Sequence, residues 1–251
     1  MSLTLQIAVL AVAGLAAGLV GSAGGITSLV SYPVLLALGL PALDATVANN
    51  VALVACWPGS ALASRRELGG RARWSARWCA VAAAAGAAGA GLLLVTPSDA
   101  FDRMVPWLVL AGTLALLLEP RMTAWRERRG RRASTAALLV PVTAVSLYNG
   151  YFGAGAGVMT LTLMLVLVDR RLATANALKN MLIGGSSVAS AAVLVLSTSV
   201  EWSFVVPLAA GMLVGANLGP RVARRVPARV LRLLIAALGF ALAVRLGAAA
   251  R

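Results

Sequence analysis

The sequence predicts an all-α integral membrane protein built from two inverted-topology helical repeats with glycine-broken or re-entrant helices. Three observations lead to this prediction. Of the 251 residues, 60% are hydrophobic and only 12% are charged, whereas soluble domains carry about 25% charged residues. The apolar residues form segments separated by short arginine-rich loops, and one glycine pattern occurs twice. We therefore expect lipid as the solvent of the fold and no nucleic-acid partner.

Ten apolar segments are expected, several of them shorter than the roughly 20 residues of a spanning helix. The chain then divides into a first transmembrane repeat (1–119), a basic cytoplasmic linker (120–133) and a second transmembrane repeat (134–251). The second and seventh segments follow glycine-rich breaks, and the sequence leaves open whether each spans fully or dips in and returns. The ten segments are 3–20, 22–38, 45–63, 76–95, 104–119, 134–152, 156–168, 175–197, 203–217 and 229–246.

The positive charges predict the orientation. Four arginine clusters follow the third, fifth, seventh and ninth segments, and cytoplasmic loops are the ones enriched in Lys and Arg. An even number of segments separates successive clusters, so all four can lie on the cytoplasmic side. Both termini then lie outside a multi-pass protein of the cell (inner or plasma) membrane. Five segments per half is an odd number, so the second half enters from the opposite side, as in inverted-repeat transporters.

A repeated glycine pattern supports duplication. Gly18, Gly21 and Gly25 have the spacing G-x2-G-x3-G, and the same spacing recurs 132 positions later at 150, 153 and 157. After a two-residue slip, an offset of 130 aligns Asn50 with Asn180. The order of these matches indicates an internal repeat.

The residues around these glycines carry a family resemblance. Residues 14–54 read GLAAGLVGSAGGITSLVSYPVLLALGLPALDATVANNVALV. They resemble the opening of the TauE/SafE family of sulfite and organosulfonate exporters, with a glycine-rich break, a proline-containing segment, a Gly-Leu-Pro turn and a helix bearing Asn. Residues 215–246, GANLGPRVARRVPARVLRLLIAALGFALAVRL, are similar to the family's closing helix pair. The resemblance implies export of sulfite, sulfoacetate, related sulfonates or other small anions, and leaves the exact substrate open.

Glycine breaks expose helix N-termini, which carry free N–H groups and roughly half a positive charge. Discontinuous helices aimed at anionic groups are a recognised transporter device. We expect the breaks at 21–25 and 153–157 to face each other from opposite halves. The alternative is that these glycines only let helices pack closely, as small residues do in bilayers.

Lys179 is the only lysine of the chain and lies inside an apolar segment. Ionisable groups within the membrane are costly and usually functional, so its ammonium is a candidate anion ligand. Snorkelling of Lys179 to the cytoplasmic interface is an equally weighted alternative. Asn180 and its repeat mates Asn49 and Asn50 are expected to face inward, for substrate or as helix–helix contacts. Trp57 could line a site, but core filling is the favoured interpretation.

Taken together, the predicted substrate-binding residues are Ser22, Gly24, Gly25, Thr27, Asn49, Asn50, Tyr148, Asn149, Gly153, Gly155, Gly157, Lys179, Asn180 and Ser186. Histidine is absent, the two cysteines lack metal-ligand spacing and there is no P-loop, so we expect no catalytic residue, metal or cofactor.

The predicted function is a secondary transporter that exports a small anion by alternating access between the repeats. An anion-selective channel is the first alternative, and an intramembrane enzyme with a Ser–Lys pair is a weaker one. Whether the protein forms a homo-oligomer is left open.

Overall fold

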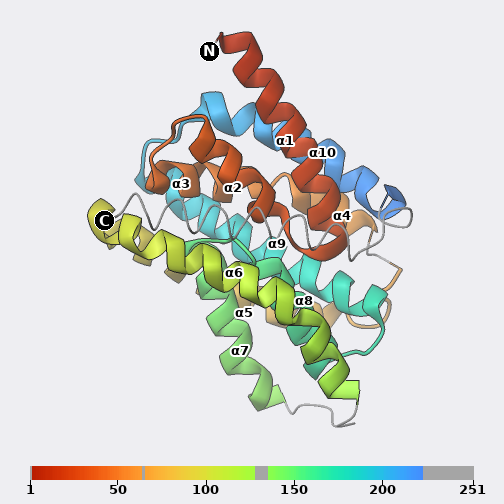
Figure 1. The fold of residues 1–251 in the computed structure, drawn as a ribbon. Coiled ribbons are helices and arrows are strands. Elements are labelled where there is room, and N and C mark those ends of the chain that lie inside the picture. Colours follow the sequence, from red (N-terminus) through yellow and green to blue (C-terminus); the bar gives the residue numbers. More distant parts are fainter. Residues whose placement is uncertain (1, 64–65, 128–134, 223–251) are drawn as a thin grey trace.

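The computed structural model describes residues 2–63, 66–127 and 135–222. These residues form ten α-helices and no β-strand, in agreement with the predicted class (Figure 1). The helices are α1 (Leu3–Gly24), α2 (Thr27–Ala37), α3 (Ala42–Leu53), α4 (Cys56–Ala63), α5 (Ala72–Val95), α6 (Ser98–Glu127), α7 (Thr135–Tyr151), α8 (Ala156–Leu167), α9 (Leu172–Ser197) and α10 (Trp202–Val222). The expected segment 229–246 lies outside the described residues.

Three described helices, α1, α5 and α9, are long and apolar enough to cross a membrane by length and composition. The helices α2 and α8 have 11 and 12 residues, about 16 and 18 Å at 1.5 Å per residue. Each is therefore about half as long as the hydrocarbon core is thick. This length fits a helix that enters the bilayer only to mid-depth.

Two boundaries differ from those expected. The helix α1 continues to Gly24, so the first break lies at Gly25 and Ile26, a few residues later than predicted. The helix α6 continues through Pro120 to Glu127, so the first part of the expected linker is helical.

The third expected segment, 45–63, is wrong as a single helix, because the chain breaks between α3 and α4. Pro58 explains the break. Proline lacks an N–H group and its ring clashes with the carbonyl four residues earlier, which here belongs to Val54. That carbonyl instead accepts a hydrogen bond from the Trp57 N–H at 3.1 Å.

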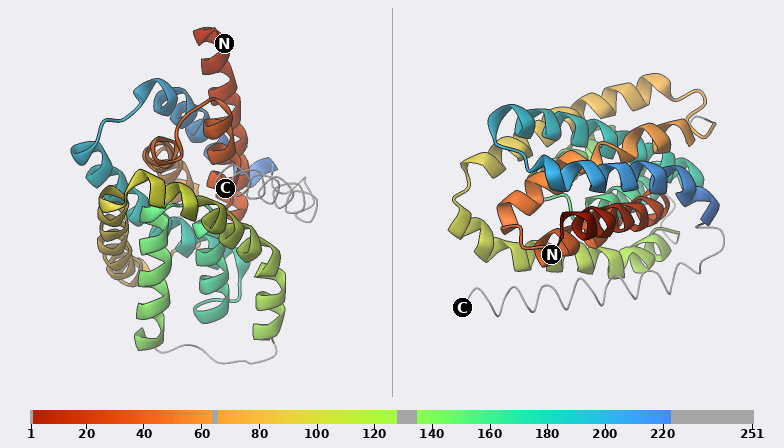
Figure 2. Two further views of the ribbon diagram at one scale, coloured as in Figure 1. Left: turned by 60° about the vertical axis from the view of Figure 1, so that its left-hand side comes forward. Right: turned by 90° about the horizontal axis from the view of Figure 1, so that it is seen from above.

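Helices from distant parts of the chain pack against each other through glycines (Figures 1 and 2). The helix α1 lies along α10, and a Cβ built on Gly14 or Gly18 would collide with the α10 backbone. The helix α7 lies along α5, where Gly150 touches the backbone of Gly86. Small residues at such contacts let backbones approach closely, which is how helices associate in lipid.

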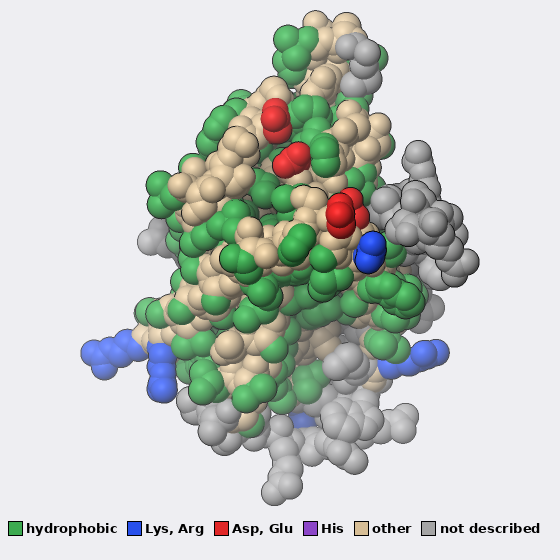
Figure 3. Space-filling view, turned by 90° about the vertical axis from the view of Figure 1, so that its left-hand side faces the viewer, with side chains coloured by type: hydrophobic (Ala, Val, Ile, Leu, Met, Phe, Trp, Pro, Cys, Tyr) green, Lys and Arg blue, Asp and Glu red, His purple; other side chains and the backbone are tan. Residues whose placement is uncertain are grey.

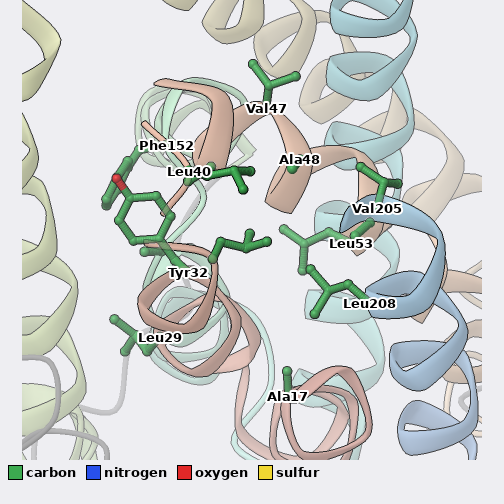
Figure 4. Close-up of a cluster of buried hydrophobic side chains, with 14 of the residues drawn as sticks. Ala17, Leu29, Tyr32, Leu40, Val47, Ala48, Leu53, Phe152, Val205 and Leu208 are labelled. Carbon is green, nitrogen blue, oxygen red and sulfur yellow. The ribbon is translucent and has the colours of Figure 1, made fainter. Parts of the chain in front are cut away.

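A buried apolar cluster joins the two breaks (Figure 4). Tyr32 of α2 packs edge-on against Phe152, which follows α7, with ring centroids 5.2 Å apart. Leu53 of α3 and Leu208 of α10 belong to the same cluster. The cluster therefore holds α2 and the end of α7 in fixed relation.

Most charges divide along the molecule. The acidic residues 44, 99, 102 and 201 lie at one set of helix starts, where Arg103 also lies. The basic residues 71, 73, 77, 170 and 171 lie at the opposite set, together with the acidic residues 67 and 169. On the face in Figure 3 hydrophobic side chains cover most of the described surface, with acidic side chains above and most basic ones toward the lower edge. An apolar belt between two differently charged ends is the surface expected of a multi-pass membrane protein.

Candidate functional site

A cavity of about 50 Å³ lies where the two glycine breaks meet. A space of this size exceeds the roughly 10–15 Å³ that one water needs. The cavity is bordered by the ends of α1, α3 and α7, the starts of α2 and α8, the chain after α7, and the facing sides of α4 and α9. Its lining consists of Gly21, Ser22, Gly25, Thr27, Ser28, Leu53, Cys56, Trp57, Ser60, Asn149, Gly153, Gly157, Lys179, Asn180, Ile183, Gly184 and Ser187.

The two breaks touch through their backbones. A Cβ built on Gly157 would stand 2.6 Å from the Gly25 Cα, and a Cβ on Gly25 would stand 2.7 Å from the Gly157 carbonyl oxygen. Gly25 and Gly153 also have positive φ angles of 75° and 83°, a conformation that glycine adopts without steric cost. The expectation that the breaks face each other is confirmed.

Two helices begin at this contact. Neither Ile26, the N-cap of α2, nor Gly155, the N-cap of α8, offers a side-chain hydrogen bond to its helix. The first turns of both helices supply residues of the cavity wall, namely Thr27 and Ser28 of α2 and Gly157 of α8. The positive ends of two helix dipoles therefore converge on one cavity, which favours negative charge there.

Lys179 of α9 is the charged side chain of the cavity. It is only 2% exposed, and its Nζ donates a hydrogen bond to the Gly21 carbonyl at 3.2 Å. Among the described residues it forms no ion pair with a carboxylate. The ammonium thus points into the protein rather than along its surface, which disfavours the snorkelling alternative.

The contact between Lys179 and Gly21 has a local reason. The last carbonyls of a helix lack partners within the helix and carry partial negative charge. At the end of α1, Gly25 N–H and Lys179 both donate to the Gly21 carbonyl, and the Asn176 side chain donates to the Ser22 carbonyl at 3.1 Å. Side chains from the second half of the chain therefore provide hydrogen-bond partners for the last carbonyls of a helix in the first half.

Hydroxyl and amide groups complete the polar wall. Asn149 Nδ2 donates to Ser186 Oγ at 3.0 Å and to Ser187 Oγ at 3.2 Å. Ser186 Oγ in turn donates to the Ser146 carbonyl at 3.1 Å. These bonds link α7 to α9 and hold Asn149 and Ser187 at the cavity. They also engage Ser186 away from Lys179, which weakens the Ser–Lys enzyme alternative.

The structure brings together eight of the predicted residues: Ser22, Gly25, Thr27, Asn149, Gly153, Gly157, Lys179 and Asn180 all line the cavity. The other six do not line it: Gly24, Asn49, Asn50, Tyr148, Gly155 and Ser186.

Asn49, Asn50 and Tyr148 support the break regions from nearby. Asn49 accepts from Ser31 Oγ at 2.5 Å and donates to Ser28 Oγ at 3.1 Å, which ties α3 to α2. Asn50 donates to the Gly150 carbonyl at 3.1 Å, across the two halves. Tyr148 donates to the Ala154 carbonyl at 2.7 Å. For Asn49 and Asn50 the helix–helix interpretation fits better than substrate contact, and Tyr148 fastens the chain between α7 and α8.

Sequence reasoning missed several wall residues. Trp57 lines the cavity although it was interpreted as core filling, and Cys56 and Ser60 stand beside it on α4. The signal was present in Pro58, which predicts a break at this point. Gly184 was missed because the Gly184–Gly185 pair lies inside an apolar helix that it does not interrupt.

The glycine pattern serves two purposes. Gly18 and Gly150, the first members of each copy, press against the backbones of α10 and α5, as the packing alternative expected. Gly21, Gly25, Gly153 and Gly157, the later members, line the cavity. Close helix packing and an open site are therefore adjacent features of one motif.

Comparison with known proteins agrees with this architecture. The chain is 29% identical over 241 residues to the "Probable membrane transporter protein ORF9" of Sinorhizobium sp, covering 96% of this chain and 92% of that one. It is 25% identical over 249 residues to a "Probable membrane transporter protein" of Haemophilus influenzae, covering 96% and 94%. It is 27% identical over 222 residues to the "Probable membrane transporter protein YfcA" of Escherichia coli K12, covering 87% and 81%.

No solved structure matches the chain significantly. The profile of the family described as "Sulfite exporter TauE/SafE" matches residues 7–246, nearly the whole chain. Together with the apolar helices and the related transporters, this match shows that the chain is a membrane transporter and belongs to the sulfite exporter TauE/SafE family.

Proposed function

We propose that this protein is a secondary transporter that exports a small anion, sulfite or an organosulfonate such as sulfoacetate. The observation that carries the proposal is Lys179, a buried ammonium in the cavity between the two glycine breaks. An isolated buried charge is costly and is normally paired. Among the described residues its bonding partner is a neutral carbonyl, that of Gly21, so an anionic ligand would complete the site.

The rest of the wall favours the same class of ligand. The first turns of α2 and α8 point positive dipole ends at the cavity, and hydroxyl groups come from Ser22, Thr27 and Ser60. No acidic side chain belongs to the described lining. A cation would meet like charge here, whereas a sulfite or sulfonate group can accept several hydrogen bonds.

Alternating access between two inverted repeats is the mechanism that we propose. It is supported by matching contacts in the two expected halves, 1–119 and 134–251. The first helix of each half packs on the helix that forms the fourth expected apolar segment of the other half, α1 on α10 and α7 on α5. The half-length helices α2 and α8 also meet at Gly25 and Gly157. Such an exchange of partners is what a pseudo-two-fold axis in the membrane plane produces.

The division of charges supports placement in the cell membrane with the basic loops in the cytoplasm. In that orientation α7 and α8 enter from the cytoplasmic side and α1 and α2 from the outer side, so the cavity lies near mid-depth. A monovalent anion that leaves an inside-negative cell gains about 2.3 kcal/mol per 100 mV. This gradient is sufficient to drive export.

Ligand-induced stabilisation tests the anion assignment. The purified protein would be heated in detergent with sulfite, sulfoacetate or taurine, and in parallel with a panel of inorganic cations as chlorides. We expect the two anions to raise the unfolding temperature in a concentration-dependent way. Stabilisation by cations alone would contradict the assignment.

A further inference from the structure

The indole of Trp57 carries a donor that no described residue satisfies. Its Nε1 is buried, yet it has no hydrogen-bond partner among the residues that the structure describes. Buried indole N–H groups usually find a partner, and an unpaired one costs free energy. Trp57 also lines the cavity, so an acceptor bound there would lie beside the indole ring.

The position of the indole is set by two features of the chain. Pro58 interrupts the helix after α3, so that Trp57 stands in the first turn of α4. Gly184 of α9 leaves room for the ring, which packs directly against it. A Cβ built on Gly184 would overlap the indole first at Cδ1 and Nε1, the edge that carries the N–H. The ring of one half therefore lies against a glycine of the other.

The indole shares the cavity wall with several polar side chains. Lys179, five residues before Gly184 on α9, belongs to the same cavity wall, as do Ser60 and Ser187. Lysine and indole are donors without acceptor capacity. An oxyanion presents several acceptor oxygens, so it can satisfy both groups at once, whereas a cation can satisfy neither.

We infer that Trp57 is a specificity-determining residue whose Nε1–H donates a hydrogen bond to an oxygen of the transported oxyanion, with Gly184 as the residue that positions the ring. This inference rests on the proposed anion site and deepens it. It adds a directional donor opposite the Lys179 ammonium, and it assigns a binding role to the break between α3 and α4.

Binding of sulfite to the purified full-length chain tests this assignment by calorimetry. Trp57→Phe keeps an aromatic ring and removes the N–H, and we expect sulfite to bind roughly tenfold or more weakly, the range for a hydrogen bond to a charged group. Trp78→Phe is the matched control, because Trp78 is buried in a separate apolar cluster and does not line the cavity. It should bind sulfite like the unaltered protein.

A spectroscopic measurement reports on the N–H itself. In protein labelled with ¹⁵N at the indole, the Trp57 signal is identified by its loss in Trp57→Phe, and we expect it to shift when sulfite is added. Gly184→Ala should move the same signal without ligand, because the added methyl displaces the ring, and should weaken sulfite binding.

The outcomes separate this inference from the proposed function. An unshifted Trp57 signal, or unaltered binding by Trp57→Phe while Lys179→Gln loses binding, would overturn the role of Trp57 and leave the anion site intact. Unaltered binding by both variants would overturn the anion site as well. If Trp57→Phe does not fold, the shift of the indole signal on addition of sulfite to the unaltered protein still tests the inference. The Trp57 signal is then identified as the one that moves in Gly184→Ala.

Discussion

The Gly25 backbone touches the Gly157 backbone, although 131 residues separate them in the chain. Neither position has room for a Cβ, and Gly25 has a φ of 75°. This contact brings the starts of α2 and α8 together and forms the floor of the cavity. The site therefore depends on two glycines for geometry and on Lys179 for charge.

Replacement of Gly25 by alanine should destabilise the protein and abolish transport. A left-handed residue with a side chain costs roughly 1–2 kcal/mol, and the collision with Gly157 adds to this. Gly70 is a matched control, because its φ is 76° and nothing lies within 4 Å of its added Cβ. We expect Gly70→Ala to show only the conformational cost and to retain transport. Equal loss of unfolding temperature in both variants would contradict the importance of the Gly25–Gly157 contact.

Substitutions at two glycines of α5 distinguish the contribution of helix packing to stability from that of helix propensity. A Cβ on Gly89 would collide with the backbone of α7 at Leu147 and Tyr151, whereas Gly91 has open space. Gly89→Ala should therefore cost about 1–3 kcal/mol of stability by overpacking. Gly91→Ala should be neutral or stabilising by up to about 1 kcal/mol, since alanine favours helix. Thermal unfolding in the same detergent compares them, and the reverse order would refute the proposed α5–α7 packing.

Lys179→Gln should weaken sulfite binding about 10- to 100-fold, the range for loss of a hydrogen bond to a charged group. Glutamine can still donate to the Gly21 carbonyl, so the fold should survive. Arg77→Gln is the control, because Arg77 is exposed near the start of α5 and is absent from the cavity wall. Calorimetry with sulfite measures both variants, and equal affinities would remove Lys179 from the site.

An ion pair joins the loops of the two halves at the basic end. Arg71 donates to Asp169 Oδ2 at 2.7 Å, and Arg171 N–H donates to Asp169 Oδ1 at 2.9 Å. Partial burial alone would raise the Asp169 pKa, but the Arg171 N–H bond and the charges of Arg71 and Arg171 together hold that pKa below the usual 3.8. Because the folded pKa is depressed, the pair stabilises fully above the unfolded value and loses its effect as pH falls through the folded pKa.

Asp169→Asn should therefore lower stability by about 1 kcal/mol at neutral pH, as ion pairs close to the protein surface do. The difference in stability between this variant and the unaltered protein should stay constant down to about pH 4 and should become smaller at lower pH. Glu67→Gln, an exposed change in the same loop region as Arg71, should show no such profile. Unfolding temperatures measured from pH 7 to pH 3 provide the comparison. A difference that grows as pH falls would contradict the predicted sign.

Much of the fold follows from apolar runs and arginine placement, because both report directly on the bilayer. The two breaks were located to within a few residues, since clustered glycines signal interrupted helices. The break before α4 was missed, although Pro58 predicts it, because the surrounding residues are uniformly apolar. The end of α6 was placed too early, at residue 119, because the apolar run stops there and the basic residues that follow were assigned to a linker, whereas the helix continues to Glu127.

The site was only partly predictable for a physical reason. Lys179 is conspicuous in sequence because a lone charge in an apolar segment has a large cost. Asn49, Asn50 and Asn149 all bond between helices. Of these three, only Asn149 also lines the cavity, a difference that only three-dimensional contacts reveal. Trp57 acquires its place from Gly184 on another helix, a relation that no local pattern reveals.

Tracer counterflow in proteoliposomes decides whether the cavity between the glycine breaks carries anions. Vesicles containing the protein would be loaded with unlabelled sulfite and given external [³⁵S]sulfite, with Lys179→Gln and Arg77→Gln vesicles in parallel. We predict that internal sulfite accelerates uptake of the tracer, that Arg77→Gln behaves alike and that Lys179→Gln does not. Uptake indifferent to internal sulfite would indicate a channel rather than a carrier, and counterflow undiminished in Lys179→Gln would contradict the anion site described above.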